Sequence, residues 1–274
     1  MPDLSKGPPV GTQDDLTLAI AAAREAGEGL RAAWADRGAL RIDAKRQGDF
    51  VSQADLGAEA LLRDRLLGPS PTDGWLGEET EARPGARRWI VDPLDGTTNF
   101  LRGIAHWAVS IALEEDGRLV LGVVHDPLKD ETFSARIGGG LHLNGVPLTP
   151  APPPGFDAAL YGTGLPFGDM PHIDDHAGDL TRILPQSAGV RRMGAAALDL
   201  AYVAAGRLDG FWERRLRPWD IAAGLVLLRE AGARVEGWTP AERPEDSGTV
   251  IAASPALFDA FATALRAPVQ VSRA

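Results

Sequence analysis

The chain has 274 residues, a formal net charge of −10 and no cysteine. This length can form one large domain or two closely packed halves, and the lack of cysteine excludes disulfides, cysteine-bound zinc and a thiol nucleophile. The acidic balance disfavours a broad surface for nucleic acid or an anionic membrane. No apolar run is long enough to cross a bilayer, and the first residues lack the apolar core of a signal peptide. We therefore expect a cytoplasmic protein with no membrane partner and no direct nucleic-acid partner.

The first half of the chain has the pattern of helices packed on a mainly antiparallel sheet. An Ala-rich segment predicts a long first helix, and apolar runs rich in β-branched residues predict strands. Glu115-Asp116-Gly117 is typical of a hairpin turn, and Asn144-Gly145 continues the antiparallel pattern. The predicted elements are helices over 12–36 and 53–67 and strands over 88–92, 106–114, 118–126 and 132–136.

The segment Pro150–Gly155 is the clearest change of composition along the chain. We place a boundary there, which divides the chain into an N-terminal half, 1–150, and a C-terminal half, 151–274. Strand and helix patterns alternate in the second half, which is typical of an α/β arrangement. The predicted elements are strands over 158–162, 190–193, 208–212, 234–237 and 249–253 and helices over 174–184, 195–206, 219–232 and 255–266.

Acidic residues gather around the predicted strand 88–92. Asp92 ends that strand, Asp95 follows three positions later, and Glu78 precedes Asp92 by fourteen positions. Magnesium prefers a few carboxylate oxygens, with water and substrate phosphate completing its shell. The combination therefore predicts a magnesium site, although each acid taken singly is also typical of a surface carboxylate or a helix cap.

Two further features complement these acids. Gly96-Thr97-Thr98 follows Asp95, and a helix that starts there would direct backbone N–H groups at a phosphate, with the Thr97 hydroxyl placed to orient a metal-bound water. Far along the chain, Asp220 opens a long apolar helix just after Pro218. Asp220 can cap that helix, bind a metal, or do both, because capping uses only one carboxylate oxygen.

Several segments resemble the inositol monophosphatase family, within the lithium-sensitive sugar-phosphatase superfamily. The strongest are Gly77–Glu79, Trp89–Phe100 and Trp219–Gly224, and residues 49–55, 122–127 and 194–197 add weaker support. Spread from about residue 40 to 254, they cover most of the chain in the expected order. The resemblance implies a layered αβαβα fold, an N-terminal mainly antiparallel sheet with a C-terminal α/β half, and a homodimer.

The resemblance also implies roles for particular residues around two or three Mg²⁺ ions. The family's metal ligands fall on the acids named above and on one backbone carbonyl, and the catalytic, phosphate-binding and substrate-binding positions follow from the same motifs. Lys45 lies near a family lysine that approaches the active site, or is an ordinary solvated lysine. The implied sets are metal ligands Glu78, Asp92, Leu94, Asp95 and Asp220, catalytic residues Glu78, Thr97 and Asp55, and substrate-binding residues Gly96, Thr97, Ala196 and Glu213.

The implied function is Mg²⁺-dependent hydrolysis of a sugar or polyol phosphate monoester by direct attack of a metal-activated water. An inositol-1-phosphatase-like activity is favoured, and histidinol phosphate, fructose 1,6-bisphosphate and NADP⁺ phosphatases of the same family are alternatives. A regulatory protein that interacts with RNA polymerase is an alternative of another class. Near Glu213, the arginines Arg214, Arg215 and Arg217 form either a solvated rim or a second site for an anion.

Overall fold

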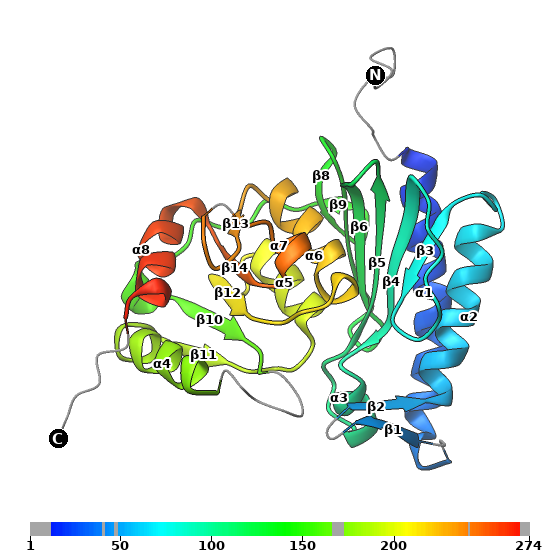
Figure 1. The fold of residues 1–274 in the computed structure, drawn as a ribbon, viewed down its shortest axis with the longest axis horizontal. Coiled ribbons are helices and arrows are strands. Elements are labelled where there is room, and N and C mark those ends of the chain that lie inside the picture. The colour runs from blue at the N-terminus through cyan, green and yellow to red at the C-terminus, as the bar shows by residue number, and fades with distance from the viewer. Residues whose placement is uncertain (1–11, 40–41, 47–48, 166–172, 241, 269–274) are drawn as a thin grey trace.

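The computed structural model describes residues 12–268 except 40–41, 47–48, 166–172 and 241, and it describes side chains outside 39–51. Its elements stack in five layers: a helix pair, a large sheet, a second helix pair, a small sheet and an outer helix pair (Figure 1). The predicted layered αβαβα fold is therefore confirmed. Within the described residues, every helix is too short or too polar to cross a bilayer.

The first layer is the helix pair α1 (Gln13–Ala35) and α2 (Gln53–Leu67). At the start of α1 the Thr12 hydroxyl accepts the Asp15 N–H at 3.1 Å, and the Asp15 carboxylate accepts the Thr12 N–H at 2.9 Å. This reciprocal capping satisfies two N–H groups that a helix start leaves without partners. Small residues on the buried face of α1, such as Ala23, let the helix approach the sheet closely.

The large sheet carries the acidic motif. Its strand order is β3-β4-β5-β6-β7-β8-β9, and neighbours are antiparallel except for β3 and β4, which are parallel. The tight turn between β5 and β6 uses positive φ at Asp116 and Gly117, as the hairpin signal predicts. The strands are β3 (Gly74–Gly77), β4 (Arg87–Asp95), β5 (Ala108–Glu115), β6 (Arg118–Asp126), β7 (Glu131–Arg136), β8 (Gly140–Leu143) and β9 (Val146–Pro147).

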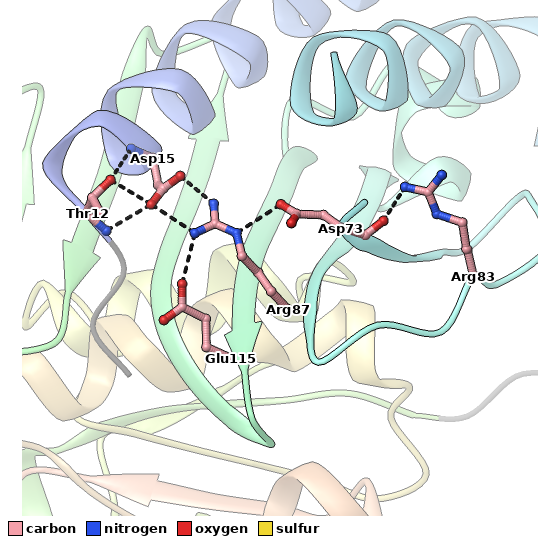
Figure 2. Close-up of polar contacts among 6 residues, drawn as sticks. All are labelled: Thr12, Asp15, Asp73, Arg83, Arg87 and Glu115. Atoms are coloured by element: carbon pink, nitrogen blue, oxygen red, sulfur yellow. Dashed lines mark hydrogen bonds and ion pairs between the residues drawn. The ribbon is translucent and has the colours of Figure 1, made fainter. Parts of the chain in front are cut away.

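An arginine at the start of β4 ties this sheet to α1 (Figure 2). The Arg87 guanidinium pairs with Asp15 of α1, with Asp73 before β3 at 2.9 Å and with Glu115 at the end of β5 at 2.9 Å. Arg83 donates a further hydrogen bond to the Asp73 backbone carbonyl. One cation thus joins four segments of the first two layers.

The central layer, α5 (Ala196–Ala204) and α6 (Pro218–Glu230), packs against both sheets. Gly122 of β6 meets the α6 backbone so closely that a Cβ on it would lie 2.5 Å from the Ala223 carbonyl oxygen. A Cβ on Gly224 would likewise lie 2.6 Å from Leu200 of α5. A single hydrophobic cluster therefore runs from the large sheet through α5 and α6 into the small sheet.

The small sheet has the strand order β11-β10-β12-β14-β13 and mixes parallel with antiparallel pairs. Helices α4 (Ile173–Ile183) and α8 (Pro255–Arg266) form the outermost layer. The strands are β10 (Leu160–Thr163), β11 (Gly189–Arg191), β12 (Gly210–Glu213), β13 (Arg234–Glu236) and β14 (Val250–Ala253). The chain changes sheets around the segment Pro150–Gly155, but a domain boundary there stays a prediction.

Several elements differ from the sequence prediction. The hairpin of β1 (Ile42–Arg46) and β2 (Asp49–Ser52), strand β3 and the short helix α7 (Pro244–Ser247) were not predicted. The first three are short and mix charged residues or glycine into the run, which hides a strand pattern. Strand β4 also continues past Pro93 to Asp95, whereas the sequence predicted an end at Asp92.

Candidate active site

The path of β4 brings its two aspartates to one end of the large sheet. Asp92 lies opposite Ser110 and Asp95 opposite Ala108, so the pairing with β5 slips by one residue between them. Such a bulge bends the strand and redirects its side chains. Gly96 then turns the chain with φ +92°, and α3 (Thr97–Arg102) begins, as the sequence predicted.

A backbone N–H group holds each of three acidic side chains. The Leu94 N–H donates to Asp92 Oδ1 at 2.9 Å, the Ala197 N–H to Asp95 Oδ2 at 2.7 Å, and the Arg217 N–H to Asp220 Oδ2 at 2.6 Å. Asp220 thus caps the start of α6 from the third position of the helix. A carboxylate has about four acceptor positions, so one hydrogen bond fixes its orientation and leaves capacity for another ligand.

The carboxyl groups lie close to one another, with Asp92 and Asp95 buried and Glu78 and Asp220 half-buried. Burial, followed by the nearby charges of Glu78, Asp95 and Asp220, raises the pKa of Asp92 well above its usual range. Burial is also the main cause that raises the pKa of Asp95 to about 7 and that of Asp220 to about 8. Among the described residues, no three acidic or histidine side chains already form a closed metal-binding group. Oxygen-only donors that repel one another fit a divalent cation, which removes the repulsion.

These pKa values predict how a cation affects stability. A carboxyl whose folded pKa is raised stabilises the fold below the unfolded pKa near 4, and that stability is lost as pH rises through about 7 to 8. In EDTA we therefore expect the melting temperature to fall between pH 6 and pH 9. The increase in melting temperature on adding Mg²⁺ should be at least about 2 °C larger at pH 8.5 than at pH 6. A Mg²⁺ effect of equal size at both pH values in thermal melts would contradict the assignment.

Thr97 and Asp55 join the first helix layer to the acidic end of β4. The Thr97 hydroxyl lies 2.9 Å from Asp55 Oδ1 and 3.0 Å from the Leu94 carbonyl oxygen, and it can donate to either. The other oxygen of Asp55 accepts the Ser52 hydroxyl at 2.5 Å and the Ser52 N–H at 3.0 Å, which caps α2. Burial raises the pKa of Asp55, and the hydrogen bonds from Ser52 and Thr97 partly offset it.

The predicted substrate-binding residues of the C-terminal half lie beside this acidic cluster. A cavity of about 90 Å³ is lined by Asp95, Asp220, Ala196 and Glu213 together with Gly164 and Asp199. Burial raises the pKa of the Glu213 carboxyl well above its usual range, and Asp220 adds to the effect. The structure thus brings together residues from β4, α5, β12 and α6. The side chain of Lys45 lies outside the described residues.

Gly164 packs directly against the Glu213 carboxyl group, and a Cβ on Gly164 would lie 2.0 Å from Glu213 Oε2. Gly164→Ala should displace Glu213 and raise the KM for a polyol phosphate about tenfold, because a hydrogen bond to substrate is worth about 1.5 kcal/mol or more. The Mg²⁺ dependence should stay near that of the wild type. Gly162→Ala is the matched control, since its Cβ would meet the Leu208 and Phe211 side chains instead. Equal KM values in the two variants would contradict this role of Glu213.

Sequence reasoning missed a buried pair beside the cavity. The His106 ring nitrogen Nε2 lies 2.9 Å from Asp199 Oδ1, and both side chains are buried. Asn99 also joins these two parts of the chain, because its side chain donates 2.8 Å hydrogen bonds to the carbonyl oxygens of His106 and Met193. The only local signal was an aspartate, Asp199, within the otherwise apolar helix 196–204.

The structure gives Arg214 a role that neither interpretation of the arginine group anticipated. Its guanidinium pairs with the fully buried Asp179 of α4 and stacks on the Trp238 ring at 3.3 Å. Arg182 also binds Asp179, at 2.5 Å. Arg214 therefore anchors the end of β12, next to Glu213, and is neither a solvated rim residue nor part of a second anion site.

Comparisons with known proteins agree with this arrangement. The model of the inositol monophosphatase family matches residues 12–270. An inositol-1-monophosphatase of Rhizobium meliloti is 43% identical, with 93% of this chain and 97% of the relative covered, and Nus factor SuhB of Pseudomonas aeruginosa is 40% identical over 93% and 96%. The crystal structure of extragenic suppressor protein suhB from Bartonella henselae superposes with a TM-score of 0.89 at 38% identity, covering 93% of this chain and 99% of that one. The chain therefore belongs to the inositol monophosphatase family of enzymes.

Proposed function

We propose that this protein hydrolyses a sugar or polyol phosphate monoester, inositol 1-phosphate foremost, with Mg²⁺ as cofactor. The observation that carries the proposal is the set of aspartates from β4 and α6, each held by a backbone N–H. Two of them, Asp95 and Asp220, line a cavity together with Glu213. Two relatives at 42–43% identity carry the name inositol-1-monophosphatase, which supports the substrate class.

Each group of the site has a proposed part in the reaction. Glu78, Asp92, Asp95, Asp220 and the Leu94 carbonyl would hold the cations, which supply an activated water and neutralise the leaving oxygen. When the Thr97 hydroxyl donates its hydrogen bond to Asp55, its oxygen is free to accept a hydrogen bond from the attacking water. This contact would orient the water toward the phosphate.

The same geometry supports proposed roles on the substrate side. The Gly96 and Thr97 N–H groups would hold the phosphate. A Cβ on Gly96 would lie 3.1 Å from the Ala195 Cβ, and the φ of +92° strains any residue other than glycine there. Glu213 would accept hydrogen bonds from ring hydroxyls, and Ala196 would lie against the ring. A substrate with many hydroxyl groups supplies the hydrogen-bond donors that the Glu213 carboxylate requires.

A panel of phosphate monoesters tests the proposal directly. We expect phosphate release from inositol 1-phosphate with Mg²⁺ and none in EDTA, together with inhibition by submillimolar to millimolar lithium. Fructose 1,6-bisphosphate, histidinol phosphate and NADP⁺ belong in the same panel, because faster turnover of one of them would reassign the substrate. No Mg²⁺-dependent hydrolysis of any compound would overturn the proposed function.

A second candidate function rests on the relatives named Nus factor SuhB, which are 38–40% identical to this chain. We propose that the protein also interacts with RNA polymerase as a regulatory partner, which is compatible with retained catalysis. Affinity capture from native lysate should recover polymerase subunits, and their absence at physiological salt would reject this role.

A homodimer and a cytoplasmic location complete the proposal, and sedimentation of the purified chain tests the dimer.

A further inference from the structure

A buried carboxylate on α2 lies outside the set of residues assigned above. Glu59 is 0% exposed, and it faces the segment that leaves β3 toward Glu78. A carboxylate is costly to bury unless hydrogen bonds compensate for the lost water. The partners of Glu59 therefore indicate what its burial achieves.

Both oxygens of Glu59 bind the turn that carries Glu78. Oε2 accepts the Glu79 N–H at 2.8 Å, and Oε1 accepts the Thr80 hydroxyl. The Thr80 oxygen in turn accepts the indole N–H of the buried Trp75 at 3.1 Å. The chain of hydrogen bonds runs from β3 through Thr80 to α2.

The residue before Glu78 contacts Glu59 as well. A Cβ on Gly77 would lie 2.3 Å from Glu59 Oε1, so only glycine allows this close approach. Glu59 thus contacts the turn at Gly77, at the Glu79 N–H and at the Thr80 hydroxyl, on both sides of Glu78. Glu78 contributes to the raised pKa values of Asp92, Asp95 and Asp220, which places it near the same acidic cluster.

We propose that Glu59 is a positioning residue that fixes the 77–80 turn so that Glu78 faces the other carboxylates. This inference rests on the proposed function, because it concerns the affinity of that site for Mg²⁺. Like charges push Glu78 away from Asp92 and Asp220 when no cation lies between them. A turn fixed from behind by Glu59 resists that repulsion, and the cation then binds without first ordering the turn. Groups that orient metal ligands in this way commonly change metal affinity by about 10- to 100-fold.

The test compares Glu59→Ala and Glu59→Gln with Leu62→Ala. Leu62 is fully buried on the same helix within a hydrophobic cluster, so its truncation destabilises the fold without removing a hydrogen bond to the turn. Glu59→Ala should raise the half-saturating Mg²⁺ concentration about tenfold or more, in activity and in Mg²⁺-induced thermal shift. The KM for inositol 1-phosphate at saturating Mg²⁺ should change less than about twofold. Glu59→Gln, which keeps one acceptor oxygen, should show a smaller increase in half-saturating Mg²⁺.

The outcomes separate this inference from the proposed function. If the wild type responds to Mg²⁺ and Glu59→Ala needs no more of it than Leu62→Ala does, the positioning role is overturned and the proposed function stands. If Glu59→Ala does not fold, an unchanged half-saturating Mg²⁺ concentration in Glu59→Gln overturns the role equally. If the wild type itself shows neither Mg²⁺-dependent hydrolysis nor a thermal shift, the proposed function and this inference fail together.

Discussion

Replacing Asp92 with asparagine should abolish turnover while leaving the metal-free protein at least as stable as the wild type. The amide oxygen can still accept the Leu94 N–H, so the backbone keeps its hydrogen bond. The substitution removes one negative charge from a buried group whose pKa is raised by burial and by Glu78, Asp95 and Asp220. Loss of this proposed cation ligand should lower kcat at least about 1000-fold, which corresponds to roughly 4 kcal/mol.

Asp126→Asn provides the matched control. Asp126 also lies buried at the end of a strand, β6, and its Oδ1 accepts the Leu128 N–H at 3.0 Å. Its other oxygen pairs with Lys129 at 2.6 Å, so the amide should lower stability and leave kcat within about twofold. Phosphate release with Mg²⁺ should therefore be lower in Asp92→Asn, whereas urea unfolding at pH 8 in EDTA should show Asp126→Asn to be the less stable variant. An Asp92→Asn enzyme with most of its activity would contradict the metal assignment.

Replacing Arg87 with methionine should destabilise the fold by about 3 kcal/mol. Arg87 is the cation that faces Asp15, Asp73 and Glu115, whose side chains are 14%, 6% and 15% exposed (Figure 2). Without it, three poorly solvated carboxylates would repel one another, and stability should recover partly as pH falls and they become protonated. Urea unfolding at pH 7.5 measures the change in the free energy of unfolding.

Arg65→Met is the comparison for this effect. Arg65 also binds two carboxylates, those of Glu25 and Asp64, but its side chain is 49% exposed. Water screens such a pair, so its loss should cost much less than the loss of Arg87. Similar losses in the two variants would show that burial of the Arg87 partners does not govern their energy.

The acidic site could be predicted because its residues carry local signals. Asp92 and Asp95 follow an apolar strand and precede glycine and threonine, and Asp220 follows a proline that starts an apolar helix. These features depend on neighbours within a few positions, so a single sequence reveals them. The same holds for the β5–β6 hairpin, whose Asp116-Gly117 turn requires positive φ at both residues.

The missed features depend on contacts between distant parts of the chain. His106 meets Asp199 across 93 positions, and Arg214 meets Asp179 across 35. No periodicity in the sequence indicates which buried acid a given arginine or histidine will face. The role of Glu59 was hidden for the same reason, because an isolated glutamate in a helix is typical of a solvated surface.

The main-chain donors of the site have an evolutionary consequence. Asp92, Asp95 and Asp220 are oriented by the N–H groups of Leu94, Ala197 and Arg217. Every amino acid except proline provides the same donor, so a substitution at these positions keeps the N–H group that orients each carboxylate. The orientation of the carboxylates is therefore inherited independently of which side-chain donors the surrounding sequence carries.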